Sequence, residues 1–462
     1  MIRMHTNKMG EAQMALKSTR KLLLSLSVAA ALGCSTGNVF ADGDRVEELE
    51  ARVAELEALV LQLLNQPKAE SGPSAAEVEA QAAEIAEQKV EEIMAEHKAE
   101  EAEKTHKHSY KFGGYVKLDT IYSDYSGGSS SGAGRDFYIP GTIPVGDNGE
   151  SYLDLHAKES RINFGSTHNL DNGATMRTFV EMDFLLSGQG NERVSNSFAP
   201  RLRHAFFTYN NWLFGQTWMT FFNVGALPEN LDFVGPAEST IFGRQAMIRY
   251  TMGNWQFAAE NPETTITPYG GGSRIVADDN MMPDLVARYN MKGDWGSFTV
   301  AGIYRELAYE NAAAGIDDST YGYGVSLSGK FMLFGKDDFR WMASTGKGLG
   351  RYMGLNTANG AVLDDMGNLE AIDSTGIFGS YRHFWNDKWR SNLTLGYLTV
   401  DNDVDLTGLG VTSEATSLHI NLIYSPVPKM DFGIEYMHAN REVESGMDGD
   451  LDRIQFSAKY AY

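Results

Sequence analysis

Cysteine is almost missing from this sequence, because Cys34 is the only one among its 462 residues. One thiol excludes an internal disulfide framework and any metal site built from several cysteines. No apolar run of about 18 to 20 residues follows position 41, which excludes a helical membrane span beyond that point. Proline is scarce at 12 residues, whereas glycine (48), phenylalanine (23), tyrosine (21) and tryptophan (7) are abundant. This composition is typical of many aromatic strands joined by turns.

Positive charge is also in deficit, since the formal net charge is −22 at pH 7. Such a chain gives no support for nucleic-acid binding. The sequence contains no HExxH, GxSxG or P-loop motif, and its ten histidines are scattered. We therefore predict that the protein is not an enzyme and has no cofactor or bound metal. Its acidic stretches do not match the spacing of a calcium-binding loop.

The N-terminal region has the pattern of an export signal. The basic stretch KSTRK at 17–21 precedes the apolar residues 22–33 and a small-residue site, VFA, at 39–41. This order predicts a signal peptide over residues 1–41 and therefore an exported protein. Lipid attachment at Cys34 is the alternative.

A heptad pattern follows the predicted cleavage site. Within residues 42–66 the apolar positions alternate at spacings of three and four, and they are Val46, Leu49, Val53, Leu56, Val60 and Leu63. This pattern predicts a short coiled coil, and valine at a with leucine at d favours two strands. An amphipathic helix lying on its own domain is the alternative. Residues 67–107 are rich in alanine and glutamate, and we interpret them as an acidic linker or helix.

From residue 108 to the end the pattern has a period of two. In the terminal stretch RIQFSAKYAY the apolar residues, such as Ile454 and Phe456, fall on one face, and Arg453 and Gln455 fall on the other. The same division between apolar and charged faces recurs along the chain. The 355 residues from 108 to 462 divide into about sixteen repeats of about 22 residues, which is the length of a strand and half of a hairpin connection.

Strands with one face of aromatic and other apolar side chains and one charged face fit a membrane barrel better than a soluble sandwich. The sequence therefore predicts an all-β fold, a transmembrane antiparallel β-barrel of about 16 strands over 108–462, preceded by the short coiled coil. Short turns and long polar loops alternate, which predicts periplasmic turns and external loops in an outer membrane. Expected partners are outer-membrane lipid, including lipopolysaccharide, and the assembly machinery that recognises a last strand ending in an aromatic residue, here Tyr462.

Five stretches carry a resemblance to a known family. They are RLRHAFFTYNNWLFGQTWMTFFN at 201–223, GRQAMIRY at 243–250, AENPET at 259–264, MPDLVARY at 282–289 and GSYRHFWNDKWRSNL at 379–393. Together with the predicted coiled coil, they resemble the DcaP-like outer-membrane porins. The resemblance implies a homotrimer of sixteen-stranded barrels, a coiled coil in the periplasm, and uptake of small anionic solutes such as dicarboxylates. The implied trimer differs from the two strands that the heptads favour.

The strand alternation also yields candidate pore-lining residues. It places these basic side chains on the polar, inward face: Lys117, Arg161, Arg177, Arg249, Arg288, Arg305, Arg340 and Arg390. Arg201 and Arg203 also point inward if their strand has no bulge, although Phe207 and Tyr209 share their parity. Arginine suits carboxylate solutes, because its planar guanidinium group can bind both oxygens at once.

The functional hypothesis is a basic ladder at a constriction, formed by Arg161, Arg177, Arg203, Arg249 and Arg288. The alternative is that these arginines pair with inward acids and brace the wall. The candidate acids are Glu181, Asp183, Glu260 and Asp284. A ladder of fixed charges in a narrow aqueous pore would favour anions.

Residues 223–240 are a candidate constriction loop, because they form a long segment after the fifth predicted strand. If this segment folds inward, Glu229, Asp232 and Glu238 are expected to face the basic wall. The alternative is an external loop lying flat. We predict a channel for passive uptake of small hydrophilic, anionic solutes. The competing function is a receptor or adhesin that uses its long acidic loops.

Overall fold

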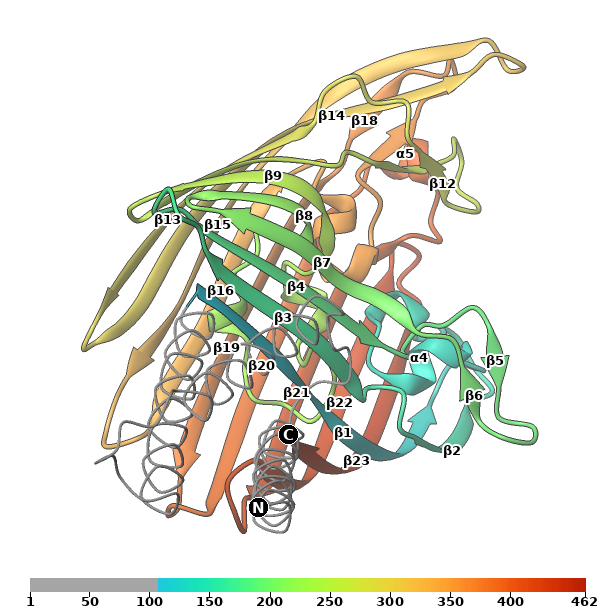
Figure 1. Ribbon diagram of the computed structural model, residues 1–462. Coiled ribbons are helices and arrows are strands. Elements are labelled where there is room, and N and C mark those ends of the chain that lie inside the picture. Colours follow the sequence, from blue (N-terminus) through green and yellow to red (C-terminus); the bar gives the residue numbers. More distant parts are fainter. Residues whose placement is uncertain (1–106) are drawn as a thin grey trace, which may run out of the picture. The chain divides into compact units, whose positions relative to one another are not determined.

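The computed structural model of the protein describes residues 107–462. The predicted signal peptide, the predicted coiled coil and nearly all of the acidic linker lie outside the described residues. Within the described part, one antiparallel sheet forms the wall of a barrel (Figure 1). None of the helices in this part is long and apolar enough to cross a bilayer.

The wall is built from seventeen strand segments. They are β1 (His108–Tyr125), β2 (Glu150–His156), β3 (Arg161–Asn169), β4 (Thr175–Asp183), β7 (Arg201–Tyr209), β8 (Trp212–Trp218), β9 (Arg244–Met252), β10 (Trp255–Glu260), β13 (Asp284–Gly293), β14 (Gly296–Asn311), β15 (Ile316–Met332), β16 (Asp338–Lys347), β19 (Asp373–Phe384), β20 (Trp389–Asp401), β21 (Thr412–Tyr424), β22 (Met430–Val443) and β23 (Asp448–Ala461).

The loops contain the remaining elements. They are α4 (Gly132–Asp136), η1 (Pro140–Thr142), β5 (Gly190–Asn191), β6 (Ser197–Phe198), η2 (Val224–Ala226), η3 (Ala237–Ser239), β11 (Thr264–Thr267), β12 (Ile275–Ala277), η4 (Gly350–Tyr352), η5 (Gly354–Asn356), β17 (Ala361–Leu363), β18 (Leu369–Ala371) and α5 (Val404–Thr407).

The barrel closes between its first and last strands. β1 pairs with β23 from Tyr115 opposite Ala461 to Tyr125 opposite Leu451, and the two strands lie side by side in Figure 1. Both β2 and β3 pair with β1, so they form one wall strand interrupted at residues 157–160. The predicted antiparallel barrel of about 16 strands is therefore confirmed.

The two faces of the wall have the inside-out polarity that the alternation predicts. Phe112 and Val116 on β1 are 67% and 58% exposed, whereas Lys117 between such residues is 5% exposed. On β23, Ile454 and Phe456 are exposed, while the polar face of the same strand is buried. Closure pairs the wall strands edge to edge and leaves large apolar side chains on the outside.

A β-bulge in β7 resolves the ambiguity at Arg203. The pairing of β7 with β4 shifts between Glu181, which lies opposite His204, and Met182, which lies opposite Leu202. Arg203 is the extra residue, so both Arg203 and His204 are buried. Because the bulge reverses the parity, Phe207 beyond it is exposed on the outer face.

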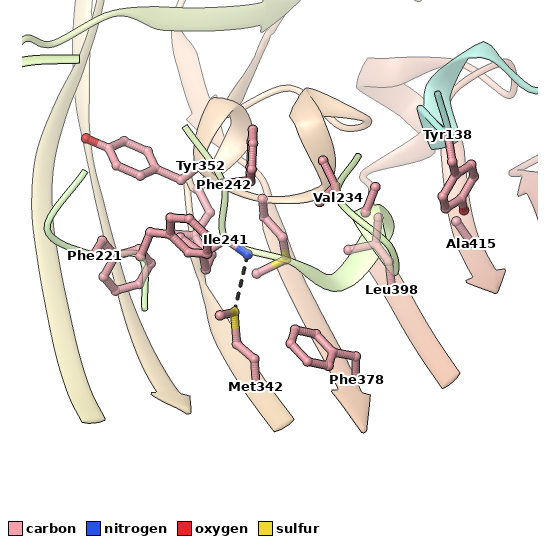
Figure 2. Close-up of a cluster of buried hydrophobic side chains, with 14 of the residues drawn as sticks. Tyr138, Phe221, Val234, Ile241, Phe242, Met342, Tyr352, Phe378, Leu398 and Ala415 are labelled. Atoms are coloured by element: carbon pink, nitrogen blue, oxygen red, sulfur yellow. Dashed lines mark hydrogen bonds between the residues drawn. The ribbon is translucent and has the colours of Figure 1, made fainter. Parts of the chain in front are cut away.

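An apolar core lies inside the barrel, where the long loops fold inward. It combines residues of three loops, including Tyr138, Phe242 and Tyr352, with side chains of the wall such as Phe378 and Leu398. Figure 2 shows these side chains, together with the hydrogen bond that the Ile241 N–H donates to Met342 Sδ. The long loops therefore fill part of the interior and fix one another.

Candidate functional site in the barrel interior

The connection between β8 and β9, residues 219–243, folds into the barrel, and we call it the inward loop. Its first half is held by arginines of the wall, which donate hydrogen bonds to backbone carbonyl oxygens at its start and along its length. These bonds join Arg249 to Trp218 (2.6 Å), Arg288 to Phe222 (2.7 Å) and Arg340 to Leu227 (2.6 Å). Arg249 and Arg288 have no described carboxylate within ion-pair distance, so their positive charge stays in place, whereas Arg340 Nε also lies 2.8 Å from Asp338 Oδ1.

The middle of the inward loop is anchored on the opposite wall by Glu229. Arg390 Nη2 lies 2.6 Å from Glu229 Oε1, and Arg382 Nη1 lies 2.8 Å from Glu229 Oε2. Burial alone would raise the pKa of Glu229, but the two arginines outweigh it and hold that pKa below its ordinary value. Glu229 is therefore an ionised anchor, and Arg390 has a bracing role in this arrangement.

Lys117 also holds the loop, rather than standing free in the lumen. Its Nζ donates to the carbonyl oxygen of Leu231 at 2.9 Å and lies 2.5 Å from Glu159 Oε2. The N–H of Leu231 donates to Glu435 Oε2 at 2.8 Å. Charged side chains from β1 and β22 thus bind the two backbone groups of one loop residue.

Asp232 is bound by backbone N–H groups of its own loop, those of Val234 and Gly235, and of a second loop. It accepts a hydrogen bond from the N–H of Tyr138 at 2.8 Å, and Arg453 Nη1 lies 3.7 Å from its carboxylate. Burial raises the pKa of Asp232 even though Arg453 opposes that shift. This acid joins two loops inside the barrel.

Glu238 does not face an arginine, in contrast to the expectation from the sequence. It is fully buried, and its Oε1 accepts a hydrogen bond from Ser417 Oγ at 2.8 Å. Its Oε2 has no hydrogen-bond partner among the described residues. Burial raises the pKa of Glu238 to about 7, although the hydrogen bond from Ser417 opposes that shift.

Raising the pH from about 5 to about 8 is expected to loosen the contact of Glu238 with the wall. The pKa of Glu238 rises from 4.5 to about 7 on burial. The contribution of protonated Glu238 to the free energy of unfolding is therefore complete below pH 4.5, declines between pH 4.5 and about pH 7, and is lost above that. The full loss is about 3 kcal/mol. The titratable and charged groups around Glu238 and its neighbour Tyr138 are Tyr138, His419, Asp232 and Arg453.

Hydrogen exchange of the amides at 237–240, corrected for intrinsic rates, measures this effect. Exchange should become faster between the two pH values in the natural protein, and the variant Glu238→Gln should remove the dependence. An equal pH response in both proteins would contradict the assignment to Glu238.

A separate group of arginines lies at one part of the wall, and we call it the arginine cluster: Arg161, Arg201, Arg203 and Arg244. Arg201 and Arg203 lie 2.8 and 2.7 Å from Asp183 Oδ2. Arg203 Nε lies 2.8 Å from Glu181 Oε1, whereas Arg161 Nη1 is 3.8 Å from the same oxygen. Three guanidinium groups thus share two carboxylates, whereas no described carboxylate lies within ion-pair distance of Arg244.

Two aromatic rings connect the members of this cluster. The guanidinium carbons of Arg161 and Arg203 lie 5.7 and 5.5 Å from the ring centroid of Phe233 in the inward loop. Those of Arg203 and Arg244 lie 5.6 and 4.6 Å from the ring centroid of Trp218. The cluster therefore lies where the inward loop meets the wall.

Three buried donors of the cluster have no hydrogen-bond partner among the described residues. They are Arg161 Nε, Arg203 Nη2 and Arg244 Nη1. Buried donors without partners are costly, so a bound group with several acceptor oxygens would be stabilised there. Arg244 was missed by the strand alternation, although it lies in the stretch GRQAMIRY at 243–250 that carries the family resemblance.

The five arginines proposed as one ladder have different partners in the structure. Arg161 and Arg203 belong to the arginine cluster, whereas Arg249 binds the Thr220 hydroxyl and Arg288 the Phe222 carbonyl of the inward loop. Arg177 is exposed, two residues into β4, and forms no ion pair within residues 107–462. Two of the candidate acids have other partners. Asp284 Oδ1 lies 3.3 Å from Arg305 Nε, and Glu260 Oε1 accepts a hydrogen bond from the N–H of Thr220 at 2.6 Å.

No group of three or more histidine, cysteine, aspartate or glutamate side chains in the described part of the chain is arranged to hold a metal ion.

A closed sixteen-stranded barrel with an apolar exterior, a charged interior and an inward loop defines an outer-membrane channel. The chain belongs to the DcaP outer membrane protein family, whose model matches residues 79–462. It is accordingly a porin of the outer membrane and not an enzyme.

Comparison with the solved structure of one channel supports the same fold. The outer membrane channel DcaP of Acinetobacter baumannii is 22% identical, with a TM-score of 0.63, over 77% of this chain and 98% of the channel. The outer membrane protein OmpT of Vibrio cholerae, in a trimer form, is 11% identical, with a TM-score of 0.47, over 77% of this chain and 100% of that protein. A search of curated proteins gave no match.

Proposed function

We propose that the channel takes up small anionic solutes of the dicarboxylate type and that the arginine cluster selects them. The observation that carries this proposal is the set of three buried guanidinium donors without partners. A carboxylate supplies the acceptor oxygens that these donors lack, and guanidinium groups bind carboxylates in a bidentate manner.

The local charge supports a dianion in particular. The four arginines of the cluster carry four positive charges, and their two acidic partners, Glu181 and Asp183, carry two negative charges. The surplus is two positive charges, which matches a solute with two carboxylates. Arg249 and Arg288 add positive charge along the inward loop, because no described carboxylate lies within ion-pair distance of either.

Removing charge from the cluster is expected to reduce anion preference. In planar bilayers under a salt gradient, the natural protein should show an anion-selective reversal potential. The double variant Arg161→Gln/Arg244→Gln should lower the anion-to-cation permeability ratio by about threefold, because fixed charge sets local ion concentration. Current block by succinate, compared with acetate, measures the preference for two carboxylates.

Lys388→Gln is the matched control, because Lys388 is an exposed cation in the turn between β19 and β20. This variant should keep the reversal potential of the natural protein. Cation selectivity of the natural channel, or equal block by succinate and acetate, would refute the proposal.

We also propose that the protein is a homotrimer whose contacts lie on the short-stranded side of the wall. β8 has 7 residues and β10 has 6, whereas β14 and β15 have 16 and 17. A strand of 7 residues is about 24 Å long and, tilted by about 40°, rises about 18 Å, which is less than the apolar band of about 25 Å. A neighbouring copy, rather than lipid, suits this side.

Thiol labelling from the lipid phase tests this arrangement. A cysteine replacing Val180 on β4 should react slowly, because a neighbouring copy covers it, whereas a cysteine replacing Leu395 on β20 should react rapidly. Both side chains are exposed in the single chain, at 39% and 56%. Native mass spectrometry should show three copies, and equal labelling of the two sites would contradict the proposed contact side.

We further propose that the long loops face the exterior, where they contact lipopolysaccharide, and that the assembly machinery recognises the last strand. Tyr462 is 42% exposed, and its ring lies 5.9 Å from that of Phe112 at the same edge of the wall. An exposed aromatic end suits recognition before the barrel closes.

A further inference from the structure

The inward loop rests on three glycines of the opposite wall, Gly376 on β19, Gly396 on β20 and Gly433 on β22. A Cβ atom at Gly396 would lie 1.9 Å from Glu238 Oε1 and 2.8 Å from the Cβ atom of Pro236. These distances are far below van der Waals contact. The loop therefore occupies the space that a side chain would need.

The other two glycines are approached in the same way. A Cβ atom at Gly433 would lie 2.7 Å from Leu231 Cδ2, and one at Gly376 would lie 3.0 Å from the Cα atom of Ser239. None of the three glycines has a positive φ angle. Close approach of the loop, rather than backbone conformation, is thus the reason why glycine is needed at these positions.

Hydrogen bonds also fix the inward loop on the part of the wall around Gly396 and Gly433. Gly396 lies directly opposite Ser417 in the pairing of β20 with β21, and Ser417 Oγ donates to Glu238 Oε1. Beside Gly433, Glu435 binds the N–H of Leu231. Each of these two glycines leaves room for a loop residue that a neighbouring wall side chain then binds.

We propose that Gly376, Gly396 and Gly433 are positioning residues that set the width of the passage. Their missing side chains determine how closely the inward loop lies against β19 to β22 and how much space remains beside the arginine cluster. The hydrogen-bonded wall is the stiffer partner, so an added methyl group displaces the loop into the lumen. The inference rests on the proposed function, because it treats the inward loop as the constriction.

Single-channel recording in planar bilayers tests the proposal. Gly396→Ala and Gly433→Ala are each expected to lower the open-channel conductance by about twofold, because pore diameter limits conduction. The double variant Gly433→Ala/Leu231→Ala should recover conductance toward the natural value, since it removes the two Leu231 methyl groups that a Cβ atom would meet. A purely destabilising role for Gly433 would not predict this recovery.

Gly302→Ala is the matched control, because a Cβ atom on this strand glycine of β14 would meet only Gly324 O at 3.9 Å. Natural conductance in folded Gly396→Ala and Gly433→Ala would overturn the proposal. If Gly433→Ala does not fold, the added Leu231→Ala should restore the yield of folded barrel, and failure to do so would also overturn it.

The outcome is separable from that of the proposed function. A non-selective natural channel whose conductance still falls in Gly396→Ala would refute anion selection and retain the positioning role. An anion-selective channel with unchanged conductance in both glycine variants would do the reverse.

Discussion

Replacing Arg203 with methionine is expected to lower the free energy of unfolding of the barrel by about 3 kcal/mol. Arg203 is fully buried and binds both Glu181 and Asp183. Methionine fills much of the same volume, but it leaves two buried carboxylates with fewer donors. Asp183 keeps Arg201 as its partner, so Glu181 contributes most of the loss. Urea unfolding of the protein in lipid vesicles, followed by tryptophan fluorescence, measures the change.

Arg177→Met is the control for this experiment, because Arg177 is an exposed arginine on the adjacent strand β4 and has no ion pair within the described residues. Its free energy of unfolding should change by less than about 0.5 kcal/mol. Adding Glu181→Gln to Arg203→Met should recover part of the stability, since it removes a buried charge whose remaining arginine partner, Arg161, lies 3.8 Å away. Equal free energies of unfolding for Arg203→Met and Arg177→Met would show that the ion pairs of Arg203 with Glu181 and Asp183 do not stabilise the barrel.

Replacing Glu229 with alanine is expected to release the middle of the inward loop and to raise the open-channel conductance by about twofold. Glu229 joins the loop to Arg382 and Arg390 on the far wall, with contacts of 2.8 and 2.6 Å. Alanine removes both contacts at once. Single-channel recording should also show more frequent flickering, because a loop with fewer anchors changes position more often.

Glu229→Gln separates anchoring from charge, because glutamine still accepts hydrogen bonds but carries no charge. It should shift the reversal potential toward anions with a smaller change in conductance. Glu370→Ala, at an exposed site on β18, should leave both quantities unchanged. If Glu229→Ala keeps the natural conductance, the inward loop is held without this anchor.

The polarity of the wall was predictable because it depends only on neighbours in the sequence. Side chains of a strand alternate between faces, so Phe112 and Val116 fall outside and Lys117 falls inside whatever lies across the barrel. The bulge at Arg203 was not predictable in the same way. One extra residue changes the parity of every residue after it, and RLRHAFFTY reads as two different alternations joined at that point.

Arg244 shows a second limit of the alternation. It shares parity with Ala246 and Ile248, which are exposed, so the pattern assigns it to the outer face. It is, however, the first residue of β9, where the inward loop returns to the wall. Its guanidinium group lies over the ring of Trp218, 4.6 Å from the centroid, and joins the arginine cluster. Strand periodicity does not apply where a strand meets a loop that folds inward.

The sequence by itself determined the inside-out barrel, the inward direction of arginines within regular strands, such as Arg249 and Arg288, and the presence of a long segment after the fifth strand. Only the tertiary structure decided which arginines are neutralised, which hold the inward loop and which keep unpaired donors. Glu229 and Arg390, for example, are 161 residues apart and meet only across the closed barrel. Alternation is a local property of one strand, whereas charge pairing depends on distances that exist only after the first and last strands have joined.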